Sequence, residues 1–234
     1  IVILQNNEDA NVLVNWGVLN YNKIILLKGS GVKIEKFANI QDPNGIPVVC
    51  FAARLLIEKG VYEFLLAAKL LDQRGLQARF ILAGDLDTKN PTGLNINDLN
   101  KIKDEGLVEF IGFQNDIQKL YASSHIICLP SYREGFPKSL MEAAAAGKAV
   151  VTTDVPGCRD AIIPNKTGVL VPVKNSKALA NAIEDLIVNS EKRKKMGIEG
   201  RKLAKKEFAI ENIVNSHLKI YDDLNKRLEQ VWKA

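Results

Sequence analysis

The sequence predicts an α/β fold in which a doubly wound parallel sheet of about six strands is followed by C-terminal helices. Three observations support this prediction. From Val48 onward, short β-branched stretches alternate with longer helical patterns, as in a parallel sheet wrapped by helices. Several of the strand-like stretches are almost wholly apolar, as expected when both faces of a sheet are covered. Beyond Pro172 the pattern becomes purely helical.

The predicted elements follow one another in a regular order. The strand patterns are "VVCFAA" (48–53), "ARFILAG" (78–84), "VEFIG" (108–112), "HIICLP" (125–130), "AVVTT" (149–153) and "GVLVP" (168–172). Helical patterns separate them at residues 60–75, 95–106, 115–124, 137–148 and 157–163. Three further helices are expected after the last strand. They are a helix over residues 176–190 with Ser176 as its N-cap, a basic helix, and a long amphipathic helix over residues 210–232.

The first 47 residues stand apart from this alternation. They contain a helix-like stretch at 7–17, a strand "KIILLK" at 23–28, and a loop through "QDPNG" that is typical of a linker. We therefore expect three parts in the chain. These are a lead-in segment over residues 1–47, an α/β domain over residues 48–208, and a C-terminal helix over residues 209–234.

Composition and charge exclude several classes of protein. A composition of 47% apolar and 25% charged residues fits a globular protein, and the longest apolar stretches are far shorter than the roughly 18 residues of a membrane helix. The net charge is +5, and the excess lies in "EKRKKMGIEGRKLAKKEF" (191–208). This basic run predicts either a solvated helix face or attraction to an acidic membrane surface. Because no aromatic residue interleaves with it, we expect no nucleic-acid binding.

The cysteines and the first residues bear on location. Cys50, Cys128 and Cys158 are odd in number and lack Cys-x-x-Cys spacing, which predicts reduced thiols in a reducing compartment. The start, "IVILQNNEDANVL", has no Met and none of the features of a signal peptide. We interpret it as a cut rather than a natural terminus.

One glycine motif resembles a dinucleotide-binding fingerprint only in part. "GSGVKI" (29–34) begins like a dinucleotide-binding fingerprint, but Ile34 occupies the third glycine position and no helical pattern follows. We expect no nicotinamide or flavin site there.

Two basic residues flank the loop after the first strand of the main pattern. "ARLLIEKG" (53–60) places Arg54 at the carboxyl end of that strand and Lys59 just before the next helix. Ligands of open parallel sheets bind beyond the carboxyl ends of the strands, so two cations there suit a phosphorylated ligand. The alternative is that both residues form surface ion pairs.

Two glutamates lie eight positions apart in "SYREGFPKSLMEAAAAGKAV" (131–150). Pro137 suits the first turn of a helix, so Glu134 is expected on the loop and Glu142 within the helix. The helix start favours an anion such as a diphosphate, and eight helical residues rise about 12 Å, comparable to the span from a ribose across a diphosphate to a hexose. The two carboxylates therefore either hold two sugars of one ligand or are solvated charges.

Four blocks of sequence together resemble a known family. "ARLLIEKG", "FIGFQNDI", "LPSYREGFPKSLMEAAAAGKAVVTTDVPGCRDAI" and "TGVLVPVKNSKALANAI" have the order and spacing of the C-terminal half of retaining glycosyltransferases of family 4, the group 1 glycosyl transferases. That family has the GT-B architecture of two Rossmann-like domains. The Glu-x7-Glu pattern alone is weakly specific, whereas the four blocks cover roughly residues 48–223.

The resemblance implies roles for the donor-binding residues. Arg54 and Lys59 correspond to the basic pair that holds the donor diphosphate. Glu134 corresponds to the catalytic position that faces the transferred sugar, and Glu142 to the residue that binds the ribose hydroxyls. The remaining positions would line the donor: Ser139 and Leu140 at the diphosphate, Gly135, Phe136 and Lys138 at the sugar, and Phe113 and Gln114 at the base. For Phe113 a place in the core is the alternative.

The resemblance also implies a mechanism. Cleavage of the bond between the anomeric carbon and phosphate leaves negative charge on the nucleoside diphosphate, which Arg54, Lys59 and the helix start would stabilise without a metal or another cofactor. The acceptor attacks from the same face, with retention. Glu134 is expected to act first as a positioning and electrostatic residue.

Family members bind the acceptor with an N-terminal domain, so the chain is expected to be the donor-binding half. In this interpretation residues 1–47 end the preceding domain and the last helix crosses back to it. We expect this fragment to bind a nucleotide sugar weakly and to transfer nothing, because the acceptor and the catalytic histidine found in many family members belong to the N-terminal domain. His125 and His217 are interpreted as structural and would not substitute for that histidine. Four apolar positions of the last helix are expected to be exposed and either to drive dimerisation or to pair with the lead-in segment: Ile220, Leu224, Leu228 and Trp232.

The resemblance favours a UDP-hexose donor and a glycan or lipid-linked acceptor in surface polysaccharide biosynthesis. The implied location is the cytoplasm, at the inner face of the membrane, with peripheral membrane association of the full-length protein. Two alternatives remain open from the sequence. They are a GT-B nucleotide-sugar epimerase and a non-catalytic nucleotide-sugar-binding module.

Overall fold

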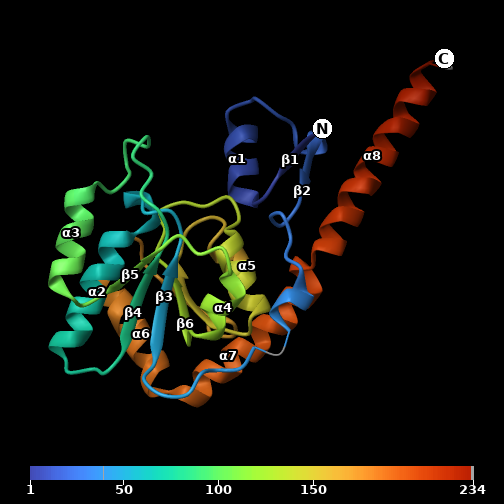
Figure 1. Cartoon of the computed structure of the whole chain (residues 1–234). Helices are drawn as coiled ribbons and strands as arrows, with labels where there is room; N and C mark the ends of the chain where they lie inside the picture. Colours follow the sequence, from blue (N-terminus) through green and yellow to red (C-terminus); the bar gives the residue numbers. More distant parts are fainter. Residues whose placement is uncertain (39, 233–234) are drawn as a thin grey trace.

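One parallel sheet organises the chain. The structure is a computed structural model that describes residues 1–38 and 40–232, without the side chains of Arg227, Val231 and Trp232. Within these residues, six strands pair in parallel in the order β5-β4-β3-β6-β7-β8. Figure 1 labels β5, β4, β3 and β6 of this sheet. They are β3 (Val48–Ala52), β4 (Arg79–Ala83), β5 (Glu109–Gly112), β6 (Ile126–Leu129), β7 (Ala149–Thr153) and β8 (Gly168–Val171). The predicted strands and the doubly wound α/β fold are confirmed.

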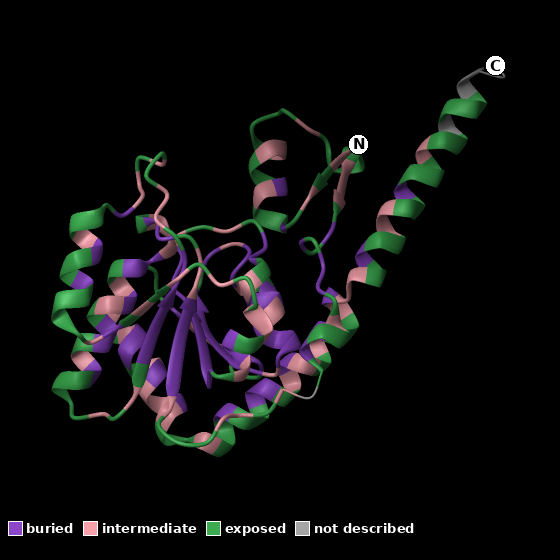
Figure 2. Cartoon of the chain, viewed as in Figure 1, coloured by how far each residue is buried: buried purple, intermediate pink, exposed green. Residues whose placement is uncertain are grey.

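Helices cover both faces of this sheet. Those of the main body are α2 (Val61–Gln73), α3 (Ile96–Glu105), α4 (Ile117–Ala122), α5 (Lys138–Ala145), α6 (Ser176–Val188) and α7 (Ser190–Leu203). Strand side chains alternate between two cores, with Val49 and Phe51 in one and Val48 and Cys50 in the other. Helices α2, α3 and α6 complete the first core, and α4 and α5 complete the second. Figure 2 shows the strands as the buried centre of the molecule.

The path of the chain along the sheet reverses between β3 and β6. Cys50 of β3 lies opposite Ile81 of β4 on one side and opposite Ile127 of β6 on the other. Helix α2 follows β3 on one face of the sheet, whereas α5 follows β6 on the opposite face. The loops after β3 and β6 therefore diverge, which leaves a crevice beyond the carboxyl ends of these strands.

Three predicted helix features are wrong. The helix expected over residues 157–163 is only a 3₁₀ turn, η4 (Arg159–Ala161), because Gly157 adopts a φ of +75° and the backbone is already extended at Ile162, ahead of Pro164. Helix α6 is capped by Asn175, whose side chain accepts the Ala178 N–H, and not by Ser176. Pro137 is the extended N-cap of α5 and lies before its first turn.

The lead-in segment forms a small unit of its own. Strands β1 (Val2–Leu4) and β2 (Ile24–Leu26) pair in parallel as a two-stranded sheet. Helix α1 (Asn7–Asn15) lies between them in the chain. Strand β1 was not predicted, because three residues at the start of a chain carry too little periodicity. After the "GSGVKI" stretch comes only a 3₁₀ turn, η2 (Ile34–Phe37), which agrees with the rejection of a dinucleotide fingerprint.

Helix α8 (Ile210–Trp232) extends away from the main body (Figure 1). Its start pairs with the lead-in segment, since the Ile210 N–H donates to the Val32 carbonyl at 3.0 Å. The predicted exposure is wrong for Ile220, which is 8% exposed, and holds for Leu228, while Leu224 is half-buried. The Trp232 side chain lies outside the described residues. Among those residues, no helix combines the length and apolarity needed to cross a membrane.

His125 joins two segments at the amino ends of β3 and β6. Its Nδ1 accepts the Val48 N–H at 2.9 Å, and its Nε2 lies 3.0 Å from the Pro43 carbonyl oxygen. This arrangement requires a neutral ring with its proton on Nε2. Burial lowers the pKa of His125 and the Arg193 charge lowers it further, whereas Asp42 opposes the shift. The geometry gives His125 a structural role.

We predict that acid weakens the fold through His125. Because its folded-state pKa lies below its ordinary value of 6.5, its contribution to stability is present above about pH 6.5 and is lost as the pH falls through the lowered pKa. Urea unfolding should therefore give a smaller free energy of unfolding at pH 5 than at pH 7.5. The His125→Gln variant keeps a hydrogen-bonding side chain without titrating, so the pH-dependent loss should shrink. An equal loss in both proteins would contradict the assignment.

Candidate functional site

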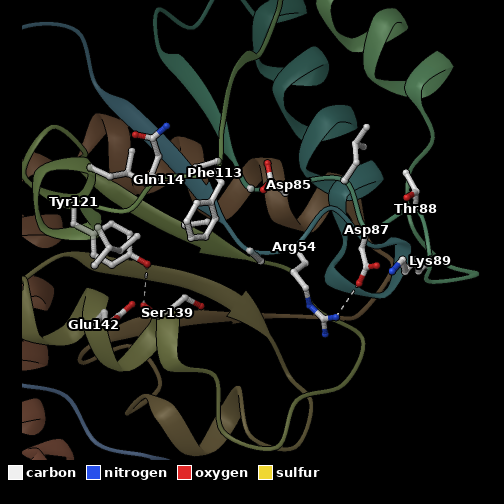
Figure 3. A pocket seen from close by; sticks show the side chains of 17 residues that line it. Arg54, Asp85, Asp87, Thr88, Lys89, Phe113, Gln114, Tyr121, Ser139 and Glu142 are labelled. Carbon is white, nitrogen blue, oxygen red and sulfur yellow. Dashed lines mark hydrogen bonds and ion pairs between the residues drawn. The ribbon is translucent and has the colours of Figure 1, made fainter.

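A cavity of about 590 Å³ opens beyond the carboxyl ends of β3 and β4 (Figure 3). Its floor consists of the small residues that end these two strands, Ala52, Ala53, Ala83 and Gly84. Polar side chains from several loops and from α5 surround this floor: Arg54, Asp85, Asp87, Thr88, Lys89, Gln114, Ser139 and Glu142. The cavity occupies the crevice that the reversal of strand order creates, so it is the candidate ligand site.

Arg54 contributes the cation at one side of the cavity. Its Nη1 donates to Asp87 Oδ2 at 3.1 Å, and 63% of its side chain is exposed. A Cβ atom on Gly84 would lie only 1.9 Å from the Ala53 carbonyl oxygen. The glycine thus lets the loop after β4, which carries Asp87, approach the loop that carries Arg54. An exposed pair of this kind is weak, so Arg54 is available to an anionic ligand.

The start of α5 forms the opposite side. Ser139 and Glu142 both line the cavity, and the buried Tyr121 hydroxyl donates to the Ser139 carbonyl at 3.3 Å. Burial raises the pKa of the Glu142 carboxyl, which Lys138 partly offsets from 3.6 Å. Ala143 to Ala146 are buried, so α5 lies directly against the sheet as predicted. Glu142 is therefore largely shielded from water, with its side chain 14% exposed at the wall of the cavity.

Phe113 and Gln114 lie at the end of the cavity near α4. Phe113 is 63% exposed and lines the cavity, which excludes the alternative core role. Gln114 Nε2 donates to the Ile111 carbonyl at 2.7 Å, which fixes the orientation of its amide. An exposed aromatic ring beside an oriented amide is suited to a planar, polar ring of a ligand.

Lys59 and Glu134 form a close ion pair outside the cavity lining. Lys59 Nζ lies 2.6 Å from Glu134 Oε1, and the two side chains are 18% and 12% exposed. Ser131 Oγ donates to the same oxygen at 2.7 Å. The structure therefore does not bring Lys59 and Arg54 together as one basic pair. Each cation has its own carboxylate partner, and the alternative of a surface ion pair describes Arg54 with Asp87 but not the shielded pair of Lys59 with Glu134.

The remaining predicted residues divide between core and surface. Phe136 is 6% exposed and packs edge-on against Phe208, so its side chain belongs to the core. Leu140 is fully buried, and its N–H donates to the Pro137 carbonyl at 3.1 Å. Lys138 is exposed. For Phe136 and Leu140, a role toward a ligand is thus confined to the backbone.

Sequence reasoning missed the loop after β4 and the hydroxyl of Tyr121. Asp85, Asp87, Thr88 and Lys89 follow β4 directly and line the cavity. The run "GDLDTKN" at the carboxyl end of a strand was the available signal. In the described part of the chain, no group of three or more His, Cys, Asp or Glu side chains is placed to hold a metal ion.

Comparisons with known proteins agree with this geometry. Residues 32–203 match the family model described as "Glycosyl transferases group 1". The chain is 33% identical over 239 residues to the N,N'-diacetylbacillosaminyl-diphospho-undecaprenol alpha-1,3-N-acetylgalactosaminyltransferase of Campylobacter jejuni, covering 97% of this chain and 61% of the relative. It is 27% identical over 228 residues to the capsular polysaccharide biosynthesis glycosyltransferase CapM of Staphylococcus aureus, covering 88% and 59%. The chain thus spans about three-fifths of the length of these curated relatives.

The fold also matches solved structures. A glycosyltransferase from Rickettsia africae superposes with a TM-score of 0.83 at 24% identity, over 96% of this chain and 63% of that one. This likeness concerns the fold, and the parallel sheet with its flanking helices fits the C-terminal domain of the GT-B architecture.

We predict that Gly157→Ala disturbs the loop that carries Glu134. Gly157 has φ +75°, and a Cβ atom there would lie 2.5 Å from the Gly135 carbonyl oxygen and 2.6 Å from that of Glu134. Gly112 is a matched control because its φ is +68° but the surrounding space is open. Both substitutions should cost about 1 kcal/mol of backbone strain, and only Gly157→Ala should cost clearly more. Equal urea midpoints for the two variants would contradict the close approach.

Proposed function

This chain belongs to the group 1 glycosyl transferase family, and from that premise we propose that it is the donor-binding half of a retaining glycosyltransferase. The enzyme would transfer a hexosyl unit from a nucleoside-diphosphate sugar to a glycan or lipid-linked acceptor. The observation that carries the proposal is the placement of Arg54, the start of α5 and Glu142 around one cavity at the topological switch of the sheet.

The polar groups around the cavity match the parts of such a donor in order. Phe113 and Gln114 would contact the base. Glu142 would accept hydrogen bonds from the ribose hydroxyls, since an ionised carboxylate has acceptors only. Arg54 and the N–H groups at the start of α5, near Ser139, would hold the diphosphate. Lys59 and Glu134 would then face the last phosphate and the sugar.

The proposed reaction depends on stabilising the negative charge that develops on the leaving diphosphate. When the bond between the anomeric carbon and the phosphate oxygen breaks, its electron pair stays on the diphosphate. Arg54, Lys59 and the positive end of α5 would stabilise that charge, and we propose that no divalent metal is needed. An acceptor hydroxyl would form the new bond on the same face of the sugar while its proton passes to the leaving diphosphate. Glu134 would position the sugar and stabilise positive charge at the reacting centre.

The acceptor is proposed from the relatives. The Campylobacter protein is named for a diphospho-undecaprenol acceptor and the Staphylococcus protein for capsular polysaccharide biosynthesis. We therefore propose a lipid-linked or glycan acceptor, used at the cytoplasmic face of a membrane during surface polysaccharide synthesis. The preference for UDP rests on the resemblance of the 131–162 block to enzymes that use UDP-hexoses.

We predict that Arg54→Ala and Glu142→Gln each weaken binding of a nucleoside diphosphate about tenfold or more, because each removes a charged hydrogen-bonding partner. Isothermal titration with UDP measures the effect. Arg79→Ala is the matched control, since Arg79 also forms an exposed ion pair, with Glu109, but lies at the amino end of β4. Unchanged affinity in both site variants would contradict the assignment of the cavity.

A thermal-shift screen tests the choice of nucleotide. A ligand that binds only the folded chain raises the melting temperature by mass action. UDP-glucose and UDP-N-acetylgalactosamine should therefore raise the midpoint more than GDP-mannose or ADP-glucose at equal concentration. A larger shift with the GDP or ADP sugar would overturn the preference for UDP and would leave the family assignment intact.

A further inference from the structure

The first turn of α1 is bonded to the loop that carries Glu134. Asn6 is only 3% exposed, and its Nδ2 donates to the Gly135 carbonyl oxygen at 3.0 Å. The same nitrogen lies 2.9 Å from Asp9 Oδ2, while Oδ1 of Asn6 accepts the Asp9 N–H at 2.8 Å. Asn6 therefore caps its own helix with its oxygen and holds a loop 129 residues away with its nitrogen.

Neighbouring residues bind the same region less tightly. Asp9 also pairs with Arg133 at 2.8 Å, and Glu8 pairs with Arg159 of the turn after β7. We call the contacts of Asn6, Glu8 and Asp9 with Arg133, Gly135 and Arg159 the α1 clasp. The ion pairs of the clasp are exposed, so they contribute little by themselves. The bond from the buried Asn6 side chain to the Gly135 carbonyl is the contact with structural consequence.

Two segments distant in sequence approach Gly135, which is itself exposed. A Cβ atom on Gly135 would lie 2.6 Å from Oε1 of the exposed Gln5 side chain, so the lead-in segment comes within contact distance on one side. On the other side, Gly157 brings its backbone against the Glu134 and Gly135 carbonyl groups. The peptide that follows Glu134 is thus fixed between two segments distant in sequence. Capping of α1 needs only the oxygen of the Asn6 side chain. The amide nitrogen of the same side chain is therefore available to the Gly135 carbonyl group, and the hydrogen bond between them sets the orientation of that carbonyl.

We propose that Asn6 is a positioning residue for Glu134, through which the lead-in segment sets the geometry of the sugar end of the donor site. The inference rests on the proposed function in that Glu134 is taken to face the transferred sugar. Glu134 Oε1 is already held by Lys59 and Ser131, so its remaining freedom is that of its backbone. The Asn6 bond to the next carbonyl removes that freedom.

Asn6→Ser separates positioning from capping. Serine caps helices about as well as asparagine, but its shorter side chain lacks the amide that reaches Gly135. The variant should bind UDP as the wild type does and should bind UDP-N-acetylgalactosamine and UDP-glucose about three- to tenfold more weakly, because only the sugar end is affected. Isothermal titration gives both affinities. Arg133→Ala, which removes an exposed clasp contact beside Glu134, should change neither affinity by more than about twofold.

The outcomes separate the two hypotheses. If wild-type chain binds neither UDP nor a UDP-sugar, the proposed function fails. If Asn6→Ser weakens the binding of UDP and of the UDP-sugars equally, or leaves both affinities unchanged, Asn6 has a structural role only and the positioning inference fails.

Amide hydrogen exchange tests the positioning without a ligand. Asn6→Ser should speed exchange in peptides covering residues 131–137 and leave a peptide covering residues 117–129 unchanged, since local opening reports the lost restraint. Unchanged exchange in residues 131–137 would overturn the inference even if ligand affinity is altered.

Discussion

The site depends on how closely the backbones of the loops approach one another at the carboxyl edge of the sheet. Added Cβ atoms would lie 2.1 Å from the Pro130 carbonyl oxygen at Gly60, 1.9 Å from that of Ala53 at Gly84, and 2.5 Å from that of Gly135 at Gly157. Only glycine tolerates these distances together with the positive φ values found there. The loops after β3, β4, β6 and β7 therefore meet as backbone, and the functional side chains point from a rigid base.

This base supports two different electrostatic environments. Around the cavity, Arg54 is largely exposed and pairs with Asp87 at 3.1 Å. Glu142 has a side chain that is only 14% exposed, and burial raises its pKa. Outside the cavity lining, Lys59 and Glu134 are mostly shielded from water and lie 2.6 Å apart. Charge interactions are stronger where water is excluded, so the Lys59–Glu134 pair is held more firmly than the exposed Arg54–Asp87 pair. The division corresponds to the two ends of the proposed donor, nucleotide at the cavity and sugar at the ion pair.

Sequence patterns predicted the parts of the structure that depend on local periodicity. The strands were found because apolar, β-branched stretches such as "VVCFAA" alternate with helical ones, and the close packing of α5 followed from its alanines. The cap of α6 was misplaced by one residue because Asn175 and Ser176 are both good N-caps. Tyr121 and Asn6 could not be found in this way. Their roles depend on contacts with Ser139 and Gly135, which are distant in sequence and which periodicity does not encode.

In the proposed function, the ion pair between Lys59 and Glu134 would also act as a filter for anions. A diphosphate that approaches Lys59 has to displace a carboxylate 2.6 Å away, and once it does so, Glu134 is left beside a charge of its own sign. A bare phosphate offers that carboxylate only repulsion. A sugar attached to the phosphate offers hydroxyl groups, which donate the hydrogen bonds that an ionised carboxylate accepts. The pair would therefore disfavour simple anions and admit those that carry a sugar.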